Sequence, residues 1–262
     1  MKKLSIILLF IFLLSLANFA QTLQAIEQEL VKNIKEVEKY SNYGSNYDDE
    51  KLSKANDVFE KNLLKYTKKA STLSFKFPAL SKLMQIATSE DGKFRIYSWD
   101  SETGGTMHEY YRVFQYLGAD GKVYSKTEDN SSEDGGVGSF VYDIFTVNAK
   151  SGKFYIVCST FIGSSQDHSQ SADLFKIEGK SLKDQVKLIK TNSGLTHTLY
   201  FGYNFFSVVD RKERPVKLIL FDKRTQTLKI PVVIENEKFP NGEVTNRFIN
   251  YRFNGTNFVK VS

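Results

Sequence analysis

Apolar residues recur every three or four positions in two stretches near the start of the chain. In each stretch they fall on one face of a helix, because an α-helix completes a turn in about 3.6 residues. The first set is Leu23, Ile26, Leu30, Ile34 and Val37, and the second is Leu52, Ala55, Phe59, Leu63 and Tyr66. Each apolar face is narrow, so each helix is expected to pack on its partner or on the rest of the chain.

The segment between these stretches carries signals that end one helix and begin the next. Gly44 lies in a polar break at residues 41–47, and glycine commonly ends a helix. Acidic residues at 48–50 open the second stretch and lysines at 65–69 close it, which matches the helix dipole at both ends. The sequence therefore predicts a helical hairpin over residues 21–70.

From Leu73 onward the hydrophobic period changes to two, which is typical of β-strands. Runs of β-branched and aromatic residues occupy 94–99, 140–147, 216–221, 228–234 and 248–253. Asp-Gly and Asn-Gly pairs between such runs suit tight turns, because these residues tolerate positive φ. The pattern predicts an antiparallel β domain over residues 71–262, with Pro231 on an edge strand because proline lacks an amide hydrogen.

Together these patterns predict an α+β fold, an N-terminal helical hairpin followed by an antiparallel β-meander. No helix-length segment separates the main strand runs, which argues against a parallel α/β sheet. The turn spacing leaves three arrangements of the meander open: a sandwich, an open barrel or a partial propeller.

The first twenty residues have the layout of a secretory signal peptide. Positive Lys2 and Lys3 precede an apolar run over residues 6–16, and the small residue Ala20 precedes Gln21. An uncleaved membrane anchor is the alternative, but the run is shorter than the roughly 20 residues that span a bilayer. We expect residues 1–20 to be removed, leaving a periplasmic or secreted protein without a transmembrane segment.

Composition narrows the classes of function. Hydrophobic residues make up 41% and charged residues 25% of the chain, as in ordinary globular proteins. The net charge of the full chain is +6, and losing Lys2 and Lys3 with the signal peptide lowers it to +4, which is mild and does not favour a nucleic-acid partner. The lone cysteine, Cys158, lies in an apolar run and excludes a disulfide scaffold or a multi-cysteine metal site. No cofactor is expected.

The segment from Ser98 to Glu109 carries the most unusual chemistry. It holds the only tryptophan, several acidic residues, a histidine and the flexible pair Gly104-Gly105. We interpret it as a binding loop with Trp99, Asp100, Glu102, Thr106, His108 and Glu109 as candidate ligand contacts. The alternative is an ordinary hairpin connection with a Gly-Gly turn, in which the tryptophan packs in the core and the polar residues have no ligand. No residue is assigned as catalytic or metal-ligating.

A resemblance appears in the same region. The stretches 91–100 and 104–108, followed by Gln115-Tyr116, resemble uncharacterised exported proteins of Bacteroidota-type bacteria. The end of the signal peptide, residues 18–21, is similar to theirs as well. That group has no known activity, so the resemblance implies an envelope or secreted location and no particular chemistry.

Three other segments or sets of residues resemble metal-binding or catalytic motifs in composition but not in spacing. The oxygen-rich segment 128–138 suits calcium in composition but lacks the glycine and glutamate positions of an EF-hand, so calcium binding stays open. Ser, His and Asp residues crowd at 163–173 without a nucleophile elbow. His108, His168 and His197 share no helical metal-binding spacing.

Two further sets of residues have both a structural and a binding interpretation. The first is a basic cluster that either protects an edge strand or binds anionic polysaccharide or lipid headgroups. It comprises Arg211, Lys212, Arg214, Lys217, Lys223, Arg224 and Lys229. The second is aromatic and forms either core pairs or a sugar-stacking face. It comprises Tyr110, Tyr111, Tyr200, Tyr203, Phe205 and Phe206.

The sequence favours a non-catalytic binding or interaction module of the cell envelope, because no group of residues has the spacing of a recognisable catalytic motif. Envelope polysaccharide or protein is the expected kind of partner. The alternative is a hydrolase of an envelope or extracellular polymer, with Asp100, Glu102 or Glu109 as acid and base and His108 assisting. The sequence alone does not decide whether the protein is an enzyme.

Overall fold

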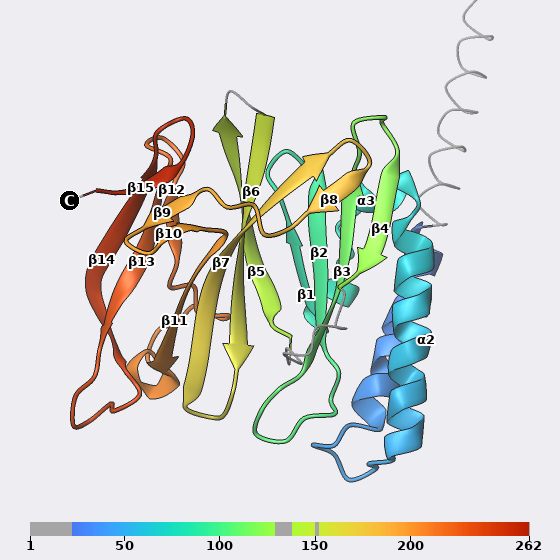
Figure 1. Cartoon of the computed structure of the whole chain (residues 1–262). Coiled ribbons are helices and arrows are strands. Elements are labelled where there is room, and N and C mark those ends of the chain that lie inside the picture. The colour runs from blue at the N-terminus through green and yellow to red at the C-terminus, as the bar shows by residue number, and fades with distance from the viewer. Residues whose placement is uncertain (1–22, 129–137, 150–151, 262) are drawn as a thin grey trace, which may run out of the picture.

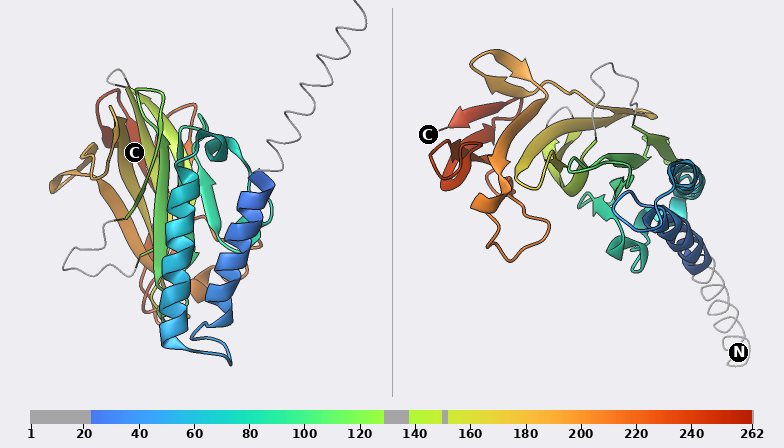
Figure 2. Two further views of the ribbon diagram at one scale, coloured as in Figure 1. Left: turned by 90° about the vertical axis from the view of Figure 1, so that its right-hand side faces the viewer. Right: turned by 90° about the horizontal axis from the view of Figure 1, so that it is seen from below.

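Helices and three β-sheets are stacked in layers from the N-terminal to the C-terminal end of the chain (Figure 1). The computed structural model describes residues 23–128, 138–149 and 152–261. The predicted signal peptide and nearly all of the segment 128–138 lie outside the described residues. Seen from below, the layers fan out in an arc (Figure 2). The predicted α+β fold is confirmed, with open sheets.

The N-terminal helices form the predicted hairpin. The first helix is described over residues 23–39 and α2 spans Asp49–Thr67, followed by the short α3 (Ala70–Ser74) and the 3-10 turn η1 (Leu80–Lys82). Asp48 caps α2, because its side chain accepts a hydrogen bond from the Lys51 amide at 3.1 Å. Among the helices described, none is long and apolar enough to cross a bilayer.

The first sheet is a four-stranded antiparallel meander that follows the helices directly. Its strands, in spatial order, are β1 (Gln85–Thr88), β2 (Phe94–Asp100), β3 (Tyr110–Leu117) and β4 (Val123–Thr127). Gly92 and Gly121 have positive φ in the turns before β2 and β4. These are the turns that the Asp-Gly pairs predict.

The second sheet is also antiparallel and lies in the middle of the stack. Its spatial order is β11 (Thr198–Asn204), β7 (Asp167–Glu178), β6 (Gly152–Ile162) and β5 (Phe140–Ala149), with β8 (Ser181–Lys183) paired to one end of β7. The late strand β11 joins this sheet beside β7, so the connectivity departs from a simple meander.

The third sheet closes the stack and has six strands. Their spatial order is β10 (Gly194–Thr196), β9 (Ile189–Thr191), β15 (Phe258–Val261), β14 (Glu243–Phe253), β13 (Thr227–Ile234) and β12 (Leu220–Asp222). β9 and β15 pair in parallel, which the predicted meander does not contain. The parallel pair arises because the last strand of the chain inserts between β9 and β14.

The prediction that Pro231 marks an edge strand is wrong, because β13 lies between β12 and β14. β12 pairs only with residues 227–229 of β13, so within the described chain no strand partner reaches Pro231 on that side. On the other side Pro231 lies opposite Phe248, and the register shifts just beyond it. The missing amide hydrogen is tolerated at this local edge.

The first and second sheets are buried on both faces, so apolar cores separate all the layers. In β2, Trp99 packs toward the helices and Ile96 packs toward the second sheet. In β6, Val157 faces the first sheet and Cys158 faces the third. Cys158 is a buried free cysteine, as predicted, and burial raises the pKa of its thiol well above the usual value. A thiol in that state is a packing group rather than a nucleophile.

Buried polar side chains of the first sheet hold the helices in position. Arg95 Nη1 donates to the main-chain carbonyls of Thr72 at 3.0 Å and Phe75 at 2.7 Å. Gln115 Nε2 donates to the carbonyl of Thr67 at 2.7 Å. These carbonyls lie in the last turn of α2 or α3 or just beyond it. There the helix has no further amides to donate hydrogen bonds to them, so the side chains of the sheet do so.

Asn56 of α2 forms a second polar link between the helices and the first sheet. Its Nδ2 donates to the carbonyl of Ser101 at 2.8 Å, and its Oδ1 accepts a hydrogen bond from Trp99 Nε1 at 3.0 Å. Asn56, Trp99 and Ser101 are all buried. Removing the amide would therefore leave a buried donor and a buried acceptor without these bonds.

We predict that Asn56→Ala lowers the free energy of unfolding by about 2–3 kcal/mol, because buried unpaired polar groups are costly. Asn62→Ala is the matched control on the same helix. Asn62 donates to Asn33 at 2.8 Å in a partly buried site, and its loss should cost about 1 kcal/mol or less. Urea unfolding measures both, and equal losses would contradict the assigned role of Asn56.

Candidate functional site

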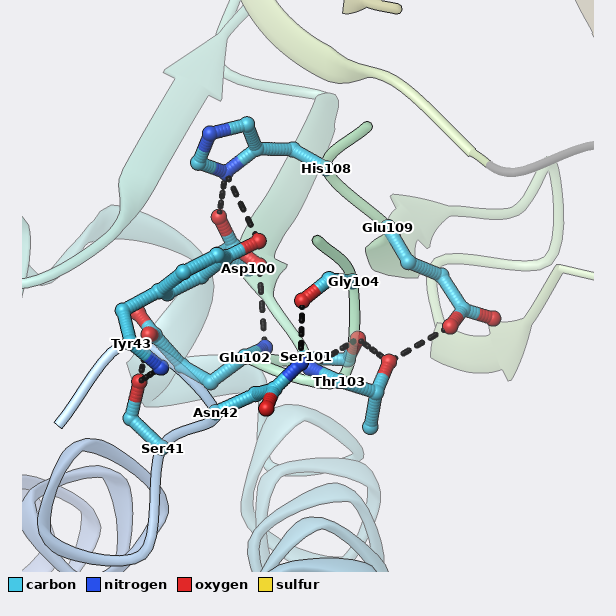
Figure 3. Close-up of polar contacts among 10 residues, drawn as sticks. All are labelled: Ser41, Asn42, Tyr43, Asp100, Ser101, Glu102, Thr103, Gly104, His108 and Glu109. Carbon is cyan, nitrogen blue, oxygen red and sulfur yellow. Dashed lines mark hydrogen bonds and ion pairs between the residues drawn. The ribbon is translucent and has the colours of Figure 1, made fainter. Parts of the chain in front are cut away.

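Residues 101–109 of the predicted binding segment 98–109 join β2 to β3 and lie against the turn between the two long helices (Figure 3). The Asn42 amide donates to the Glu102 carbonyl at 3.0 Å, and Asn42 Nδ2 donates to the Gly104 carbonyl at 2.8 Å. Ser41 Oγ donates to Glu102 Oε2 at 2.6 Å. We call this contact between residues 41–43 and residues 100–109 the clasp, because it ties the helices to the first sheet.

Asp100 and His108 form the closest polar pair of the clasp. His108 Nδ1 lies 2.5 Å from Asp100 Oδ2, and the Tyr43 hydroxyl lies 3.5 Å from the same nitrogen. The His108 ring packs against Tyr43 with ring centroids 5.1 Å apart and stacks on Tyr110 at 6.2 Å. Asp100 also accepts a hydrogen bond from the Glu102 amide at 2.9 Å. The His108 ring therefore contacts two tyrosine rings as well as the Asp100 carboxylate.

The clasp is an acidic, partly buried environment. Burial raises the pKa of the Glu102 carboxyl, and neighbouring Asp100 adds to this, despite the hydrogen bond from Ser41. Burial and the charges of Asp100 and Glu102 raise the pKa of Tyr43 to about 12. Burial and Asp100 also raise the pKa of Tyr110. At neutral pH these tyrosines keep their protons, so their hydroxyls can act as hydrogen-bond donors.

The structure brings three of the six candidate residues together around Tyr43: Asp100, Glu102 and His108 (Figure 3). Glu109 points to the other side of the loop, where it accepts a hydrogen bond from Thr103 Oγ1 at 2.6 Å. Thr106 is exposed at the tip of the loop. The loop's acidic side chains are thus largely occupied by contacts within the protein.

Trp99 belongs to the core, which was the alternative interpretation of this segment. It is only 1% exposed and packs edge-on against Phe59 at 5.0 Å. Its ring therefore serves mainly as a core group. A small pocket of about 240 Å³ adjoins the strand at this point and is lined in part by Trp99, Asp100, Tyr110 and Phe140.

A larger cavity lies between the first and second sheets and was not identified from the sequence. This inter-sheet cleft has a volume of about 590 Å³. Its aromatic walls are Phe114 and Phe175, its basic residues are Arg112, Lys126 and His197, and its acidic residues are Glu128, Asp173 and Asp184. The volume is in the range of sites that enclose small ligands.

Charged groups in the cleft are held by specific contacts. Arg112 makes a two-point ion pair with Glu128, with Nε 2.5 Å from Oε2. Asp173 accepts a hydrogen bond from Ser171 Oγ at 2.6 Å. Lys126 Nζ lies 5.8 Å from the centre of the Phe114 ring. The cleft therefore presents both signs of charge above the largely buried rings of Phe114 and Phe175.

The cleft was missed because its residues alternate along ordinary-looking strands. Arg112 and Phe114 point to the same side of β3, and Asp173 and Phe175 point to the same side of β7. A detectable signal exists, since charged residues occupy positions of β3 and β7 that share a face with buried aromatics. These charged positions indicate a cleft only when the tertiary structure shows that this face of β3 lies opposite this face of β7.

The remaining motifs of the sequence are dispersed. Among the described residues no group of three or more His, Cys, Asp or Glu side chains is placed to hold a metal ion. In the segment 163–173, Ser164 Oγ donates to Asp167 at 2.8 Å, while the ring of His168 stacks on Phe205. Of the aromatic set, Tyr200 is 77% exposed whereas Tyr203 is buried, so the six residues do not share one face.

The basic cluster is also divided among different contacts. Lys223 follows edge strand β12 and pairs with Glu90 at 2.5 Å. Lys217 pairs with Asp143 at 3.3 Å, and Arg214 donates to main-chain carbonyls of its own loop. These contacts favour a structural role for these three residues.

This chain matches no protein-family model, no curated protein and no solved structure. The geometry of the clasp and of the inter-sheet cleft therefore carries the functional argument.

We predict that the stability of the wild-type protein relative to Glu102→Gln falls as pH rises from about 4.5 to 7.5. The raised pKa means that the folded state holds the Glu102 proton more tightly than the unfolded state. The stabilisation from the protonated Glu102 carboxyl is fully present below the pKa that Glu102 has in the unfolded chain. It is lost as pH rises through the higher pKa that Glu102 has in the folded protein. Urea unfolding of both proteins across this range measures it.

An exposed glutamate, Glu237→Gln, controls for the loss of one negative charge. Parallel pH profiles for wild type and Glu102→Gln would show that the clasp does not hold Glu102 as described.

Proposed function

We propose that this chain is an exported, non-catalytic binding module of the cell envelope whose ligand is a charged oligosaccharide held in the inter-sheet cleft. The observation that carries the proposal is the cleft itself, with its volume of about 590 Å³ and both signs of charge beside aromatic side chains. Sites for polar ligands combine apolar contact surface with a few fixed polar groups.

The chemistry of the cleft favours a sugar that carries charged substituents. Phe114 and Phe175 are only 3% and 8% exposed, and their edges give the cleft an apolar floor that a sugar ring can contact. Lys126 and His197 suit carboxylate or sulfate groups, while Asp173 and Asp184 suit amino groups and hydroxyls. A small apolar ligand would leave these polar groups without partners, which disfavours it.

Binding is proposed rather than catalysis because the acidic residues of the 101–109 loop serve the clasp. Glu102 and Glu109 each accept a hydrogen bond from a neighbouring hydroxyl, at 2.6 Å in both cases. The envelope location is part of the proposal and rests on the predicted signal peptide over residues 1–20.

One observation supports the alternative, a hydrolase of an envelope or extracellular polymer. The Asp100–His108 pair is only partly buried, and Asp100 lines the neighbouring pocket of about 240 Å³. A carboxylate paired with a histidine can exchange protons with a substrate. In this alternative Asp100 and His108 would transfer protons during hydrolysis in the 240 Å³ pocket, and the inter-sheet cleft would not be the active site.

We predict that wild-type protein binds oligosaccharides containing uronic acids or amino sugars, and that the double variant Lys126→Gln/Asp184→Asn weakens binding about tenfold or more. Each substitution removes a charged hydrogen-bonding group worth about 1.5–3 kcal/mol, while the net charge is unchanged. Isothermal titration calorimetry measures the affinity, with a neutral glucan oligomer as the comparison ligand.

The control is Glu36→Gln/Lys39→Gln, which removes an exposed ion pair on the first helix and also leaves the net charge unchanged. Its affinity should equal that of wild type. Failure of every charged oligosaccharide to bind, or unchanged affinity in the cleft variant, would overturn the proposed ligand. If wild-type protein cleaves the same glycans and the Asp100→Asn variant does not, the result would favour the hydrolase.

We also predict that the chain is processed between Ala20 and Gln21 during export in its native host. The expected result is a periplasmic or extracellular species whose intact mass corresponds to residues 21–262. Ala20→Tyr should block processing, because the cleavage site requires a small residue. A full-length protein confined to the cytoplasm would contradict export while leaving the cleft experiment interpretable.

A further inference from the structure

The outer face of the third sheet lies at the end of the stack farthest from the helices, and no described layer covers it (Figure 1). Leu228 and Ile230 of β13 and Phe258 of β15 point inward and pack in the core shared with the second sheet. Their neighbours along each strand point outward, because successive side chains of a strand alternate between the two faces. The covering of one sheet by the next therefore stops at this face.

The pairing register fixes which side chains share the outer face. In the row next to this one, Lys229 of β13 lies opposite Leu220 of β12, and Phe248 of β14 lies one row further on. One row crosses all six strands, from β10 to β12. It consists of Leu195, Lys190, Val259, Arg252, Thr227 and Asp222.

Large apolar side chains are exposed on this face. Leu195 is 51% exposed, Leu220 is 45% exposed and Phe248 is 37% exposed. They belong to three different strands, β10, β12 and β14, so the apolar groups are spread across the sheet. The solvent face of an antiparallel sheet is normally polar. Apolar groups gathered on one open face are typical of a surface that contacts a partner.

The charges on the same face are mainly positive. Lys190 and Arg252 are exposed and Lys229 is partly exposed, and none of the three forms an ion pair among the described residues. The one acidic side chain of the long row, Asp222, serves its own turn. Its Oδ1 accepts hydrogen bonds from two amides of that turn, at 2.9 and 3.1 Å. The face is therefore complementary to a negatively charged surface.

We propose that the outer face of the third sheet docks on an anionic lipid bilayer. Its three cations contact the negative headgroups, and its three exposed apolar side chains enter the boundary between headgroups and acyl chains. A bilayer offers negative charge over a broad area, which matches cations spread over β9, β13 and β14 rather than gathered in a pocket. A second copy of this chain fits less well, because two positive faces would oppose each other.

This docking does not depend on the proposed oligosaccharide site. The inter-sheet cleft lies between the first and second sheets, whereas the docking face belongs to the third. Neither Lys190 nor Arg252 lines the cleft. A protein docked in this way would keep the cleft open to a ligand, and loss of either activity leaves the other measurable.

Vesicle cosedimentation tests the proposal. It compares vesicles of phosphatidylglycerol and phosphatidylcholine in equal parts with vesicles of phosphatidylcholine alone. Wild-type protein should bind the neutral vesicles about tenfold more weakly or less, because each cation near a negative surface contributes to binding. Added salt should weaken binding to the anionic vesicles, since counterions screen the charges. All variants carry the same N-terminus, so the apolar run at residues 6–16 contributes equally wherever it is retained.

The variant Lys190→Gln/Arg252→Gln removes two of the three cations. Its affinity for the anionic vesicles should fall about tenfold or more. The matched control is Lys32→Gln/Lys61→Gln, which removes two exposed lysines from the helices at the other end of the stack. The control should keep the wild-type affinity although its net charge equals that of the first variant. Melting temperatures confirm that both variants are folded.

A third variant tests the apolar part of the face. Leu220→Asn/Phe248→Ser leaves the charge unchanged and should weaken binding to the anionic vesicles about threefold or more, because less apolar surface leaves water on docking. Sedimentation equilibrium of the protein without lipid is run alongside. A dimer that forms in wild type and is lost in this variant would assign the face to a second copy and overturn the proposal.

Three vesicle results would also overturn it. They are the absence of wild-type binding to anionic vesicles, equal binding to anionic and neutral vesicles, and equal losses of affinity in Lys190→Gln/Arg252→Gln and its control. The last result would mean that the overall charge of the protein, and not this face, is responsible for the attraction.

Discussion

The fold depends on one constraint, namely that the first and second sheets each have two apolar faces and must be covered on both. The helical hairpin covers the first sheet, the second sheet fills the middle, and the third sheet covers its remaining face (Figure 1). Residues 94–99 of β2 are buried without interruption, and the polar residues among them, Arg95 and Ser98, form hydrogen bonds within the protein. Hydrophobic burial drives the stacking but does not by itself fix how the layers are oriented.

Orientation comes from a small number of buried polar contacts. Arg95 and Gln115 reach from the first sheet to carbonyls at the ends of the helices, and Asn56 reaches from α2 to the end of β2. Glu27 of the first helix accepts hydrogen bonds from the amides of Ala79 and Leu80, at 2.7 and 3.0 Å. Any shift of the helices would leave these groups unpaired, so the helices have one favoured position.

The cavities of the protein follow from the same stacking. Twisted sheets cannot stay in contact over their whole area, and the layers of this protein fan out (Figure 2). Where the first and second sheets diverge, charged side chains replace apolar ones and the inter-sheet cleft opens. On the opposite face of the second sheet, a pocket of about 180 Å³ lies beside the segment at residues 214–216. The clasp differs from both, because there a loop is pressed against a turn and its polar groups satisfy one another.

Local patterns in the sequence determined the helical hairpin, the β-rich remainder, several of the tight turns and the buried state of Cys158. These properties depend on residues close together in the chain, which periodicity and turn chemistry describe directly. The same patterns show that Arg112 and Phe114 share a face of their strand, but not which sheet that face meets. Only the tertiary structure decided that Trp99 lies in the core, that Glu102 meets Ser41, and that Pro231 lies at a local edge of an inner strand. Each of these depends on contacts between distant segments, for which the order of residues carries no local signal.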